Sequence, residues 1–188
     1  MAAVSTFAGA TEVENDRAIE GLGTPEAEWL GWPGLAHLPA LTVGELVPPG
    51  ARAVVVAPHP DDEVLSVGGV LAMLAGNGSP AMVIAVTDGA ASHTGSLEWP
   101  RSRLLRERPR ETVRALAQLG MDGEPVRLHL PDGSVTASAL AARLASLLRS
   151  GDVVFTTWRR DGHPDHDATG SACAEAADAC SARLVEVP

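Results

Sequence analysis

Short apolar runs alternate with longer stretches of helical periodicity from residue 51 onward. Five runs predict β-strands, over residues 53–57, 81–87, 126–130, 152–157 and 183–187. Helical patterns separate them, over residues 62–76, 109–119, 136–149 and 164–182. This alternation indicates βαβ units around a parallel sheet, and the uninterrupted runs VVVA and MVIAV suit strands covered on both faces. We therefore predict an α/β fold, with a Rossmann-like, doubly wound, mainly parallel five-stranded sheet flanked by helices in a single domain.

One proline bears on the helix before the third strand. Pro109 lies within the helical pattern of this region. A proline has no N–H to donate and fits the first turn of a helix better than its interior. We therefore expect a helix to begin near Pro109, and residues 101–108 to form a separate turn or short helix.

The chain before residue 51 has no sustained period, because glycines and prolines interrupt it. We expect residues 1–50 to form an N-terminal extension packed on a domain that spans residues 51–188. Trp29, Trp32 and Leu35 are the side chains expected to anchor the extension by burying apolar surface. Surface packing is a better explanation of these residues than ligand binding.

Composition narrows the functional classes. The chain has 188 residues, all 14 basic residues are arginine, and 24 acidic residues give a formal net charge of −10. An acidic protein of this kind is a poor general nucleic-acid binder, since binding phosphates needs a net basic face. No apolar stretch has the length of a signal peptide core or of a membrane span, so we expect a cytoplasmic location and no membrane partner. Cys173 and Cys180, expected on one helix, are too far apart to form a disulfide with each other.

The candidate chemistry follows two of the predicted strands. Pro58-His59-Pro60-Asp61-Asp62-Glu63 comes directly after the first strand, and a segment rich in His and Asp, residues 158–167, comes directly after the fourth. Ligands of open α/β sheets bind beyond the carboxyl ends of the strands. His163 and His166 are three residues apart at the start of a helix, so both can face the same crevice. Acidic residues alone would be an ordinary helix cap, but three imidazoles near two strand ends are more than a cap requires.

Two imidazoles and a carboxylate suit zinc with one coordination position left for water, which is the arrangement of a hydrolytic site. His59 and Asp62, three residues apart, can both reach one ion, and one histidine of the second segment completes the set. Asp61 is then free to act as a base. The residue types alone do not decide which of His163 and His166 binds the metal.

These residues resemble the markers of the PIG-L/LmbE-like zinc-dependent N-deacetylases, which remove acetyl or other acyl groups from amino sugars and related glycoconjugates. The markers are an (A/P)HPDDE element after the first strand and an HPDH element after a later one. They are complete here as PHPDDE, residues 58–63, and HPDH, residues 163–166. Thr87-Asp88-Gly89 and Leu130-Pro131-Asp132-Gly133 are secondary matches. The resemblance covers about residues 51–188 and excludes the N-terminal extension.

The resemblance implies a role for each matching residue. His59, Asp62 and His166 would bind one zinc ion, Asp61 would be the general base, and a cationic His163 would stabilise the oxyanion or protonate the leaving amine. Glu63 and Asp165 would orient ligands or cap helices. The resemblance also implies that Arg108 and Asp132 lie near the sugar. Asp88 is expected to contact the substrate as well, because it follows a strand whose end faces the same crevice. The resemblance thus implies a small N-acyl amino sugar or glycoconjugate as substrate, with no nucleic-acid partner and no implied oligomeric state.

Two other functions deserve comparison. Two histidines and one carboxylate can also hold iron(II) for oxygen chemistry, but that set usually places His and carboxylate two residues apart on a strand of a β-barrel. The second alternative is a metal-bound module of a larger protein that recognises carbohydrate without turning it over. It arises because the chain extends only a short way past His166, whereas family members usually continue with elements that wall the substrate pocket. The presence of all five proposed catalytic and metal-binding side chains favours an enzyme.

Overall fold

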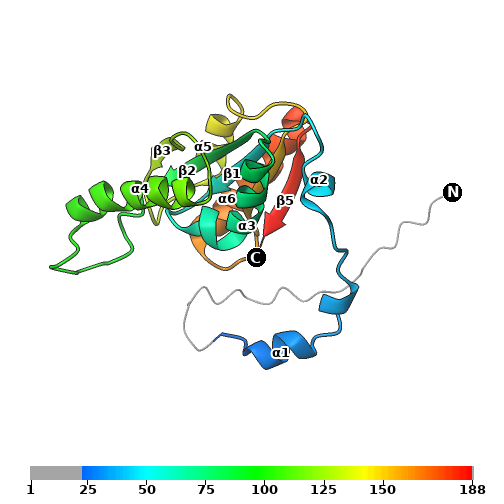
Figure 1. Cartoon of the computed structure of the whole chain (residues 1–188). Coiled ribbons are helices and arrows are strands. Elements are labelled where there is room, and N and C mark those ends of the chain that lie inside the picture. Colours follow the sequence, from blue (N-terminus) through cyan, green and yellow to red (C-terminus); the bar gives the residue numbers. More distant parts are fainter. Residues whose placement is uncertain (1–22, 188) are drawn as a thin grey trace.

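Five parallel strands form a single sheet in the order β3-β2-β1-β4-β5 (Figure 1). The computed structural model describes residues 23–187. The strands are β1 (Ala53–Ala57), β2 (Ala81–Thr87), β3 (Val126–Leu130), β4 (Val153–Thr157) and β5 (Arg183–Val187). All four strand pairings are parallel. The predicted α/β fold and its five-stranded parallel sheet are confirmed.

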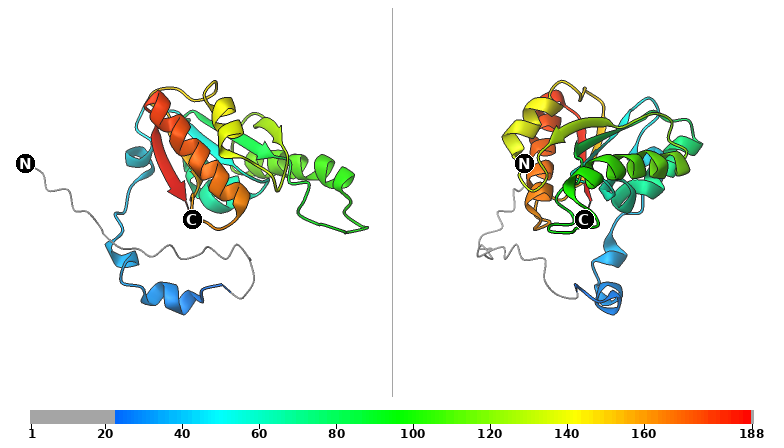
Figure 2. Two further views of the ribbon diagram at one scale, coloured as in Figure 1. Left: turned by 180° about the vertical axis from the view of Figure 1, so that it is seen from behind. Right: turned by 90° about the vertical axis from the view of Figure 1, so that its left-hand side faces the viewer.

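Helices cover both faces of this sheet. α5 (Ala137–Leu144) and α6 (Pro164–Cys180) pack on one face, which Figure 2 shows from behind, and α3 (Asp62–Gly76) packs on the other. Alternate residues of each strand point to opposite faces, so Val54 and Val56 of β1 belong to the first core and Val55 to the second. Each central strand is therefore buried on both sides, which explains the uninterrupted apolar runs of the sequence.

The helix before β3 differs from the prediction. α4 runs from Arg101 to Gln118 as one helix with Pro109 inside it, so the expected break before Pro109 is wrong. The helix is anchored on both sides of the proline, because Leu104 precedes it and Leu116 follows it, each only 2% exposed. Packing of both halves onto the same body outweighs the missing hydrogen bond at Pro109. α5 is also shorter than the helix expected over residues 136–149.

The described part of the N-terminal extension has two regions. α1 (Glu26–Gly31) and the short 3-10 helix Leu35–His37 lie apart from the sheet and its helices in Figures 1 and 2. Trp29 and Trp32 contact each other edge to face, and each is 50% exposed. Closer to the sheet, α2 (Val43–Leu46) and Val47 pack against the core that contains α3. Within residues 23–187, no helix combines the length and the apolar character needed to cross a bilayer.

The order of the strands places a crevice between β1 and β4. The chain leaves β1 towards β2 on one side, whereas β4 leads to β5 on the other side. This is the topological switch point at which open α/β sheets bind their ligands, beyond the carboxyl ends of the strands. The two sequence segments that carry the candidate chemistry follow β1 and β4, so they meet at this crevice.

A buried ion pair joins β1 and β4 at their amino-terminal ends, opposite the crevice. Arg52, just before β1, donates from Nε to Asp152 Oδ1 at 3.0 Å and from Nη2 to Asp152 Oδ2 at 2.6 Å. Asp152, just before β4, is 3% exposed and also accepts the backbone N–H of Arg149. The pair is bidentate and ties the starts of the two central strands together.

Replacing Asp152 with Ala should lower the free energy of unfolding by about 3 kcal/mol, because it leaves the Arg52 guanidinium partly buried without its counter-charge. Urea denaturation followed by circular dichroism measures the change. Asp178→Ala is the matched control, since Asp178 is exposed on α6. A loss no larger for Asp152→Ala than for this control would show that the pair does not stabilise the fold.

Candidate metal and catalytic site

Two turns supply the site, and the helix that follows one of them is held very close to the sheet. α6 begins at Pro164 with His163 as its N-cap, whose Nδ1 accepts the backbone N–H of Asp165 at 3.2 Å. A Cβ on Gly170 would lie 2.6 Å from the carbonyl oxygen of Thr157 at the end of β4. Only a glycine fits this approach, which sets the position of His163 and His166 relative to the strand ends.

Three ligand-type atoms form a nearly equilateral triangle at the centre of the site. His59 Nδ1 is 3.3 Å from His166 Nε2 and 3.5 Å from Asp62 Oδ2, and the third side, from His166 Nε2 to Asp62 Oδ2, is 3.4 Å. Ligand atoms of a tetrahedral zinc ion, each about 2.0–2.1 Å from the metal, lie roughly 3.3–3.4 Å apart. The triangle therefore has the dimensions of a zinc site, and its donors are of the types that zinc prefers.

Carboxylates stand behind both of these imidazoles. His166 Nδ1 is 2.9 Å from Asp161 Oδ2, while His59 Nε2 is 3.1 Å from Asp165 Oδ2 and 3.3 Å from Asp132 Oδ1. Each histidine thus has one nitrogen facing the triangle and the other facing an acid. Metal-ligating histidines are commonly oriented in this way, because the acid fixes the tautomer and the ring angle.

Other combinations of the same side chains can also be grouped around one ion. His59, His163 and His166 form one such set, and His59, Asp132 and Asp165 form another. Asp165, which is 0% exposed, already accepts the backbone N–H groups of Gly133 and Val135, at 2.7 and 3.0 Å. These bonds make Asp165 a buried brace between the β3–α5 loop and α6, in keeping with an orienting role.

The electrostatics of the site favour a bound cation. Burial lowers the pKa of His59, but contacts with Asp132, Asp165 and Asp62 outweigh it and raise this pKa to about 11. Burial also opposes the charged form of Asp62, yet its contacts with His166 and His59 hold the pKa of this carboxyl below its usual value. Carboxylates outnumber imidazoles in the cluster, so positive charge, whether protons or a metal ion, is stabilised there.

Asp61, which directly precedes Asp62 in the turn after β1, is held in a strained conformation. Its φ angle is 128°, which only glycine adopts without cost, and its side chain is 56% exposed. Its backbone N–H donates to Glu63 Oε2, and Arg108 Nη2 lies 3.2 Å from its carboxylate. Burial raises the pKa of Asp61, although the charge of Arg108 opposes the shift. The strain is typical of a residue whose position is fixed for function.

Arg108 is hydrogen-bonded to the turn that carries Asp61. It donates to the carbonyl oxygens of Pro60 and Gly89 as well as to the Asp61 carboxylate. Gly89 has a φ of 65°, and a Cβ there would lie 2.1 Å from Arg108 Nη1. The structure therefore places Arg108 as a support for Asp61. The sequence prediction that it contacts the sugar stays a prediction.

His163 and Asp88 are the remaining predicted site residues. The His163 ring centroid is 4.9 Å from that of His59 and 4.8 Å from that of His166. Burial, together with the charges of His59 and His166, lowers the pKa of His163. Its Nδ1 accepts the backbone N–H of Asp165, which leaves Nε2 as the ring nitrogen free to donate, and the lowered pKa favours the neutral ring. The cationic form implied by the resemblance stays a prediction. The Asp88 carboxylate binds Arg127 and His129 on β3, and Asp88 lines a cavity together with Asp132, so its expected contact with the substrate stays a prediction.

Sequence reasoning did not single out Asp161, although it lies directly behind His166. Its signal was its position in the His- and Asp-rich segment, two residues before His163, which it shared with Asp165 and Asp167. Glu63 has the burial of a core residue, at 2% exposure, and burial raises its pKa. Its Oε2 accepts the Asp61 N–H, whereas Oε1 has no hydrogen-bond partner among residues 23–187. Glu63 thus fixes the backbone of Asp61, in keeping with an orienting role.

The chain was compared with known protein families and solved structures. The family described as PIG-L, GlcNAc-PI de-N-acetylase, matches residues 54–177. The chain matches no curated protein sequence. N,N′-diacetylchitobiose deacetylase from Pyrococcus horikoshii is similar with a TM-score of 0.66 and 23% identity, over 85% of this chain and 60% of that chain. The A40926 pseudoaglycone deacetylase Dbv21 is similar with a TM-score of 0.55 and 28% identity, over 71% and 62% of the two chains.

A third structure shows that this fold also occurs with other chemistry. 4-Carboxy-2-hydroxymuconate hydratase from Pseudomonas putida KT2440 is similar with a TM-score of 0.57 and 22% identity, over 67% of this chain and 55% of that chain. At this identity, as for the chitobiose deacetylase, the likeness is one of fold alone. The chain spans less than two thirds of the length of each of these three proteins.

The close approach at Gly170 can be tested by adding a single methyl group. Gly170→Ala should lower the free energy of unfolding by about 1–3 kcal/mol, because the Cβ meets backbone atoms that cannot move independently of the sheet. Gly69→Ala on α3 is the matched control, since nothing lies within 4 Å of its Cβ. Urea denaturation should show that this control is stabilised by up to about 1 kcal/mol. Equal effects for the two variants would contradict the role given to Gly170.

Proposed function

Since the chain belongs to the PIG-L family, as its PHPDDE and HPDH motifs predicted, we propose that it is a zinc-dependent hydrolase that removes an N-acetyl or N-acyl group from an amino sugar or glycoconjugate. The observation that carries the proposal is the triangle of His59, Asp62 and His166, with the His163 ring next to it and Asp61 directly before Asp62 in the chain. The A40926 pseudoaglycone deacetylase, which is 28% identical, supports the deacetylase activity.

The donor set fits zinc, so His59 Nδ1, Asp62 Oδ2 and His166 Nε2 would hold the ion. When bound, zinc acts as a Lewis acid that makes water a better nucleophile and polarises a carbonyl oxygen. Asp161 and Asp165 orient the two imidazoles, because each carboxylate accepts a hydrogen bond from the ring nitrogen that faces away from the triangle.

Asp61 acts as the general base. Its carboxylate takes a proton from the attacking water and gives it to the amide nitrogen as the C–N bond breaks, so the products are a carboxylate and an amine. The raised pKa of Asp61 suits this exchange, because it brings the carboxyl closer to the operating pH. Arg108 and Glu63 hold Asp61 in its strained conformation throughout.

His163 stabilises the oxygen on which negative charge develops. Its Nδ1 is occupied by the Asp165 N–H, so Nε2–H is the group that can donate into the crevice. A hydrogen bond from a fixed donor is stronger to the developing oxyanion than to the ground-state carbonyl, which lowers the barrier. A neutral imidazole meets this need without carrying a charge near the zinc ligands.

Asp61→Asn should reduce acetate release by about 10²- to 10⁴-fold, because the amide cannot accept the proton of water. The assay uses the zinc-loaded protein with N-acetylglucosamine and N,N′-diacetylchitobiose as substrates, and Asp178→Asn as the control for loss of one acidic charge. Turnover by Asp61→Asn at the wild-type rate would contradict the assigned base. Absence of acetate release from wild type with every N-acylated sugar tested, despite bound zinc, would favour the carbohydrate-recognition alternative.

Zinc content of single variants tests the ligand set. Wild type should bind one zinc ion per chain, as measured by elemental analysis after dialysis. Asp62→Asn and His166→Ala should lose the metal, whereas His163→Ala should retain it and lose turnover, because His163 lies outside the triangle. Loss of zinc from His163→Ala with retention in Asp62→Asn would assign the ion to the three histidines. Loss from Asp132→Asn with retention in Asp62→Asn would assign it to the set that contains Asp165.

A further inference from the structure

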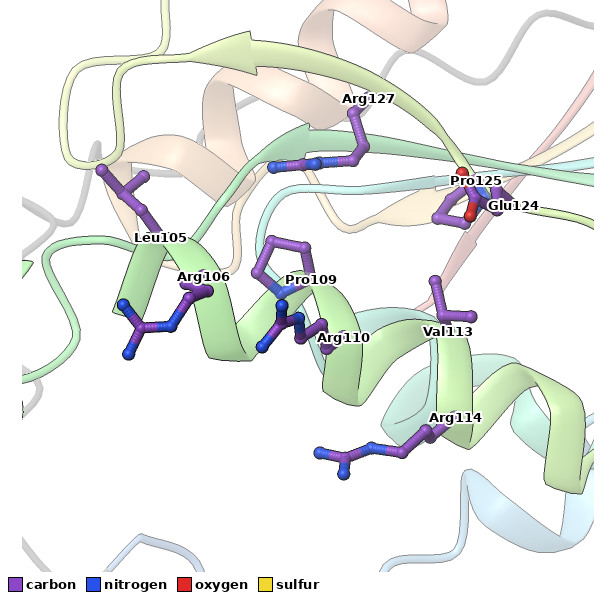
Figure 3. A pocket seen from close by; sticks show the side chains of 9 residues that line it. All are labelled: Leu105, Arg106, Pro109, Arg110, Val113, Arg114, Glu124, Pro125 and Arg127. Atoms are coloured by element: carbon purple, nitrogen blue, oxygen red, sulfur yellow. The ribbon is translucent and has the colours of Figure 1, made fainter. Parts of the chain in front are cut away.

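A groove separate from the triangle runs between α4 and the strand at that edge of the sheet (Figure 3). Its volume is about 600 Å³, which lies within the range of small-molecule binding sites. Leu105, Pro109 and Val113 of α4 provide an apolar floor, together with Pro125 just before β3. The groove is therefore large enough, and apolar enough, to accommodate the body of an organic ligand.

Arginines line this groove on both sides. Arg106, Arg110 and Arg114 recur at intervals of four on α4, so they share one face of the helix, with roughly 6 Å of rise between neighbours. Arg127 lines the groove from β3, and Figure 3 shows its side chain extended along the strand above Pro109. Glu124 is the acidic residue of the lining. The lining thus carries four guanidinium groups and one carboxylate, in a protein whose formal net charge is −10.

These guanidinium groups are only partly neutralised by the protein itself. Arg106 is paired with Glu107 at 2.9 Å, and Arg110 is 3.7 Å from the other oxygen of the same carboxylate. Arg127 is paired with Asp88 at 2.7 Å. In the described part of the chain, no carboxylate oxygen lies within 4 Å of Arg114. Like charges four residues apart on a helix repel one another. Glu107 offsets this repulsion between Arg106 and Arg110, and a bound anion would offset it between Arg110 and Arg114.

We propose that this groove binds an organic dianion, with its anionic groups on the arginines and its apolar body on Leu105, Pro109 and Val113. Guanidinium forks bind carboxylate, phosphate and sulfonate oxygens in pairs, which gives direction as well as charge. The rest of this acidic surface repels such a ligand, so the groove is the place where it is retained.

The groove adjoins the proposed catalytic centre. A second cavity of about 260 Å³ shares Leu105 with the groove and is also lined by His129 and Asp132. Asp132 in turn lies 3.3 Å from His59. The dianion can therefore be a charged arm of the substrate itself or a separate ligand, and the same groups recognise it in both cases.

Binding of 1,5-naphthalenedisulfonate tests the proposal directly, because this probe has two sulfonates on an apolar body and is a weak metal ligand. Its fluorescence is titrated with the full-length, zinc-loaded protein. The double variant R110Q/R114Q should weaken binding at least tenfold, and naphthalene-1,5-diol, which lacks the charges, should not bind measurably. R143Q/R149Q is the matched control, since it removes two exposed arginines at and after α5, outside the groove. It should change the dissociation constant less than twofold.

Unchanged affinity in R110Q/R114Q, or an equal loss in R143Q/R149Q, would overturn the proposal. Circular dichroism confirms that each variant is folded, and R110K/R114K, which keeps the charge and loses the forks, should give an intermediate affinity. A second arm identifies the source of the anion, and only this arm depends on the proposed hydrolase activity. A rise in KM confined to N-acetylglucosamine 6-phosphate, with none for N-acetylglucosamine, shows a substrate arm. An unchanged KM for both, with loss of probe binding, shows a separate ligand.

Discussion

The pairing of β1 with β4 is the constraint on which the site depends. Val56 of β1 is in register with Thr156 of β4, so the two strands end at the same level of the sheet. The turns that follow them bring His59 Nδ1 within 3.3 Å of His166 Nε2, although the residues are 107 positions apart in the chain. A parallel pair at the switch point is needed for this, since its two carboxyl ends open into one crevice.

Much of this arrangement could be predicted from the sequence, because it depends on period and on residue type. Apolar runs identified all five strands, and the turns after two of them identified His59, Asp62, His163 and His166 as candidates. The choice of His166 over His163 as a metal ligand came from the family resemblance. The helix through Pro109 could not be predicted, since it is stabilised by the packing of Leu104 and Leu116. Helix propensities of the residues near Pro109 do not include such tertiary packing. Tertiary contacts decided the structure there.

Finer features of the site also needed coordinates. The direction in which each imidazole nitrogen points, and hence the place of Asp161 behind His166, is set by the geometry of a short turn. Asp88 was expected near the substrate because it follows a strand. Its carboxylate binds Arg127 and His129 of the neighbouring strand, and Asp88 shares a cavity with Asp132, so its expected place near the substrate stays a prediction. The partners of a side chain at a strand end lie on another strand, and for this reason its position in the sequence does not identify them.

The helix cap made by His163 limits how protons can travel. Its Nδ1 is held by the N–H of Asp165, so the ring cannot pass a proton from one nitrogen to the other without opening the first turn of α6. Nε2 is then the one ring nitrogen of His163 left free to donate. In the proposed reaction, proton transfer between water and product would fall to the partly exposed Asp61 carboxylate, while the imidazole stays fixed by the helix it caps.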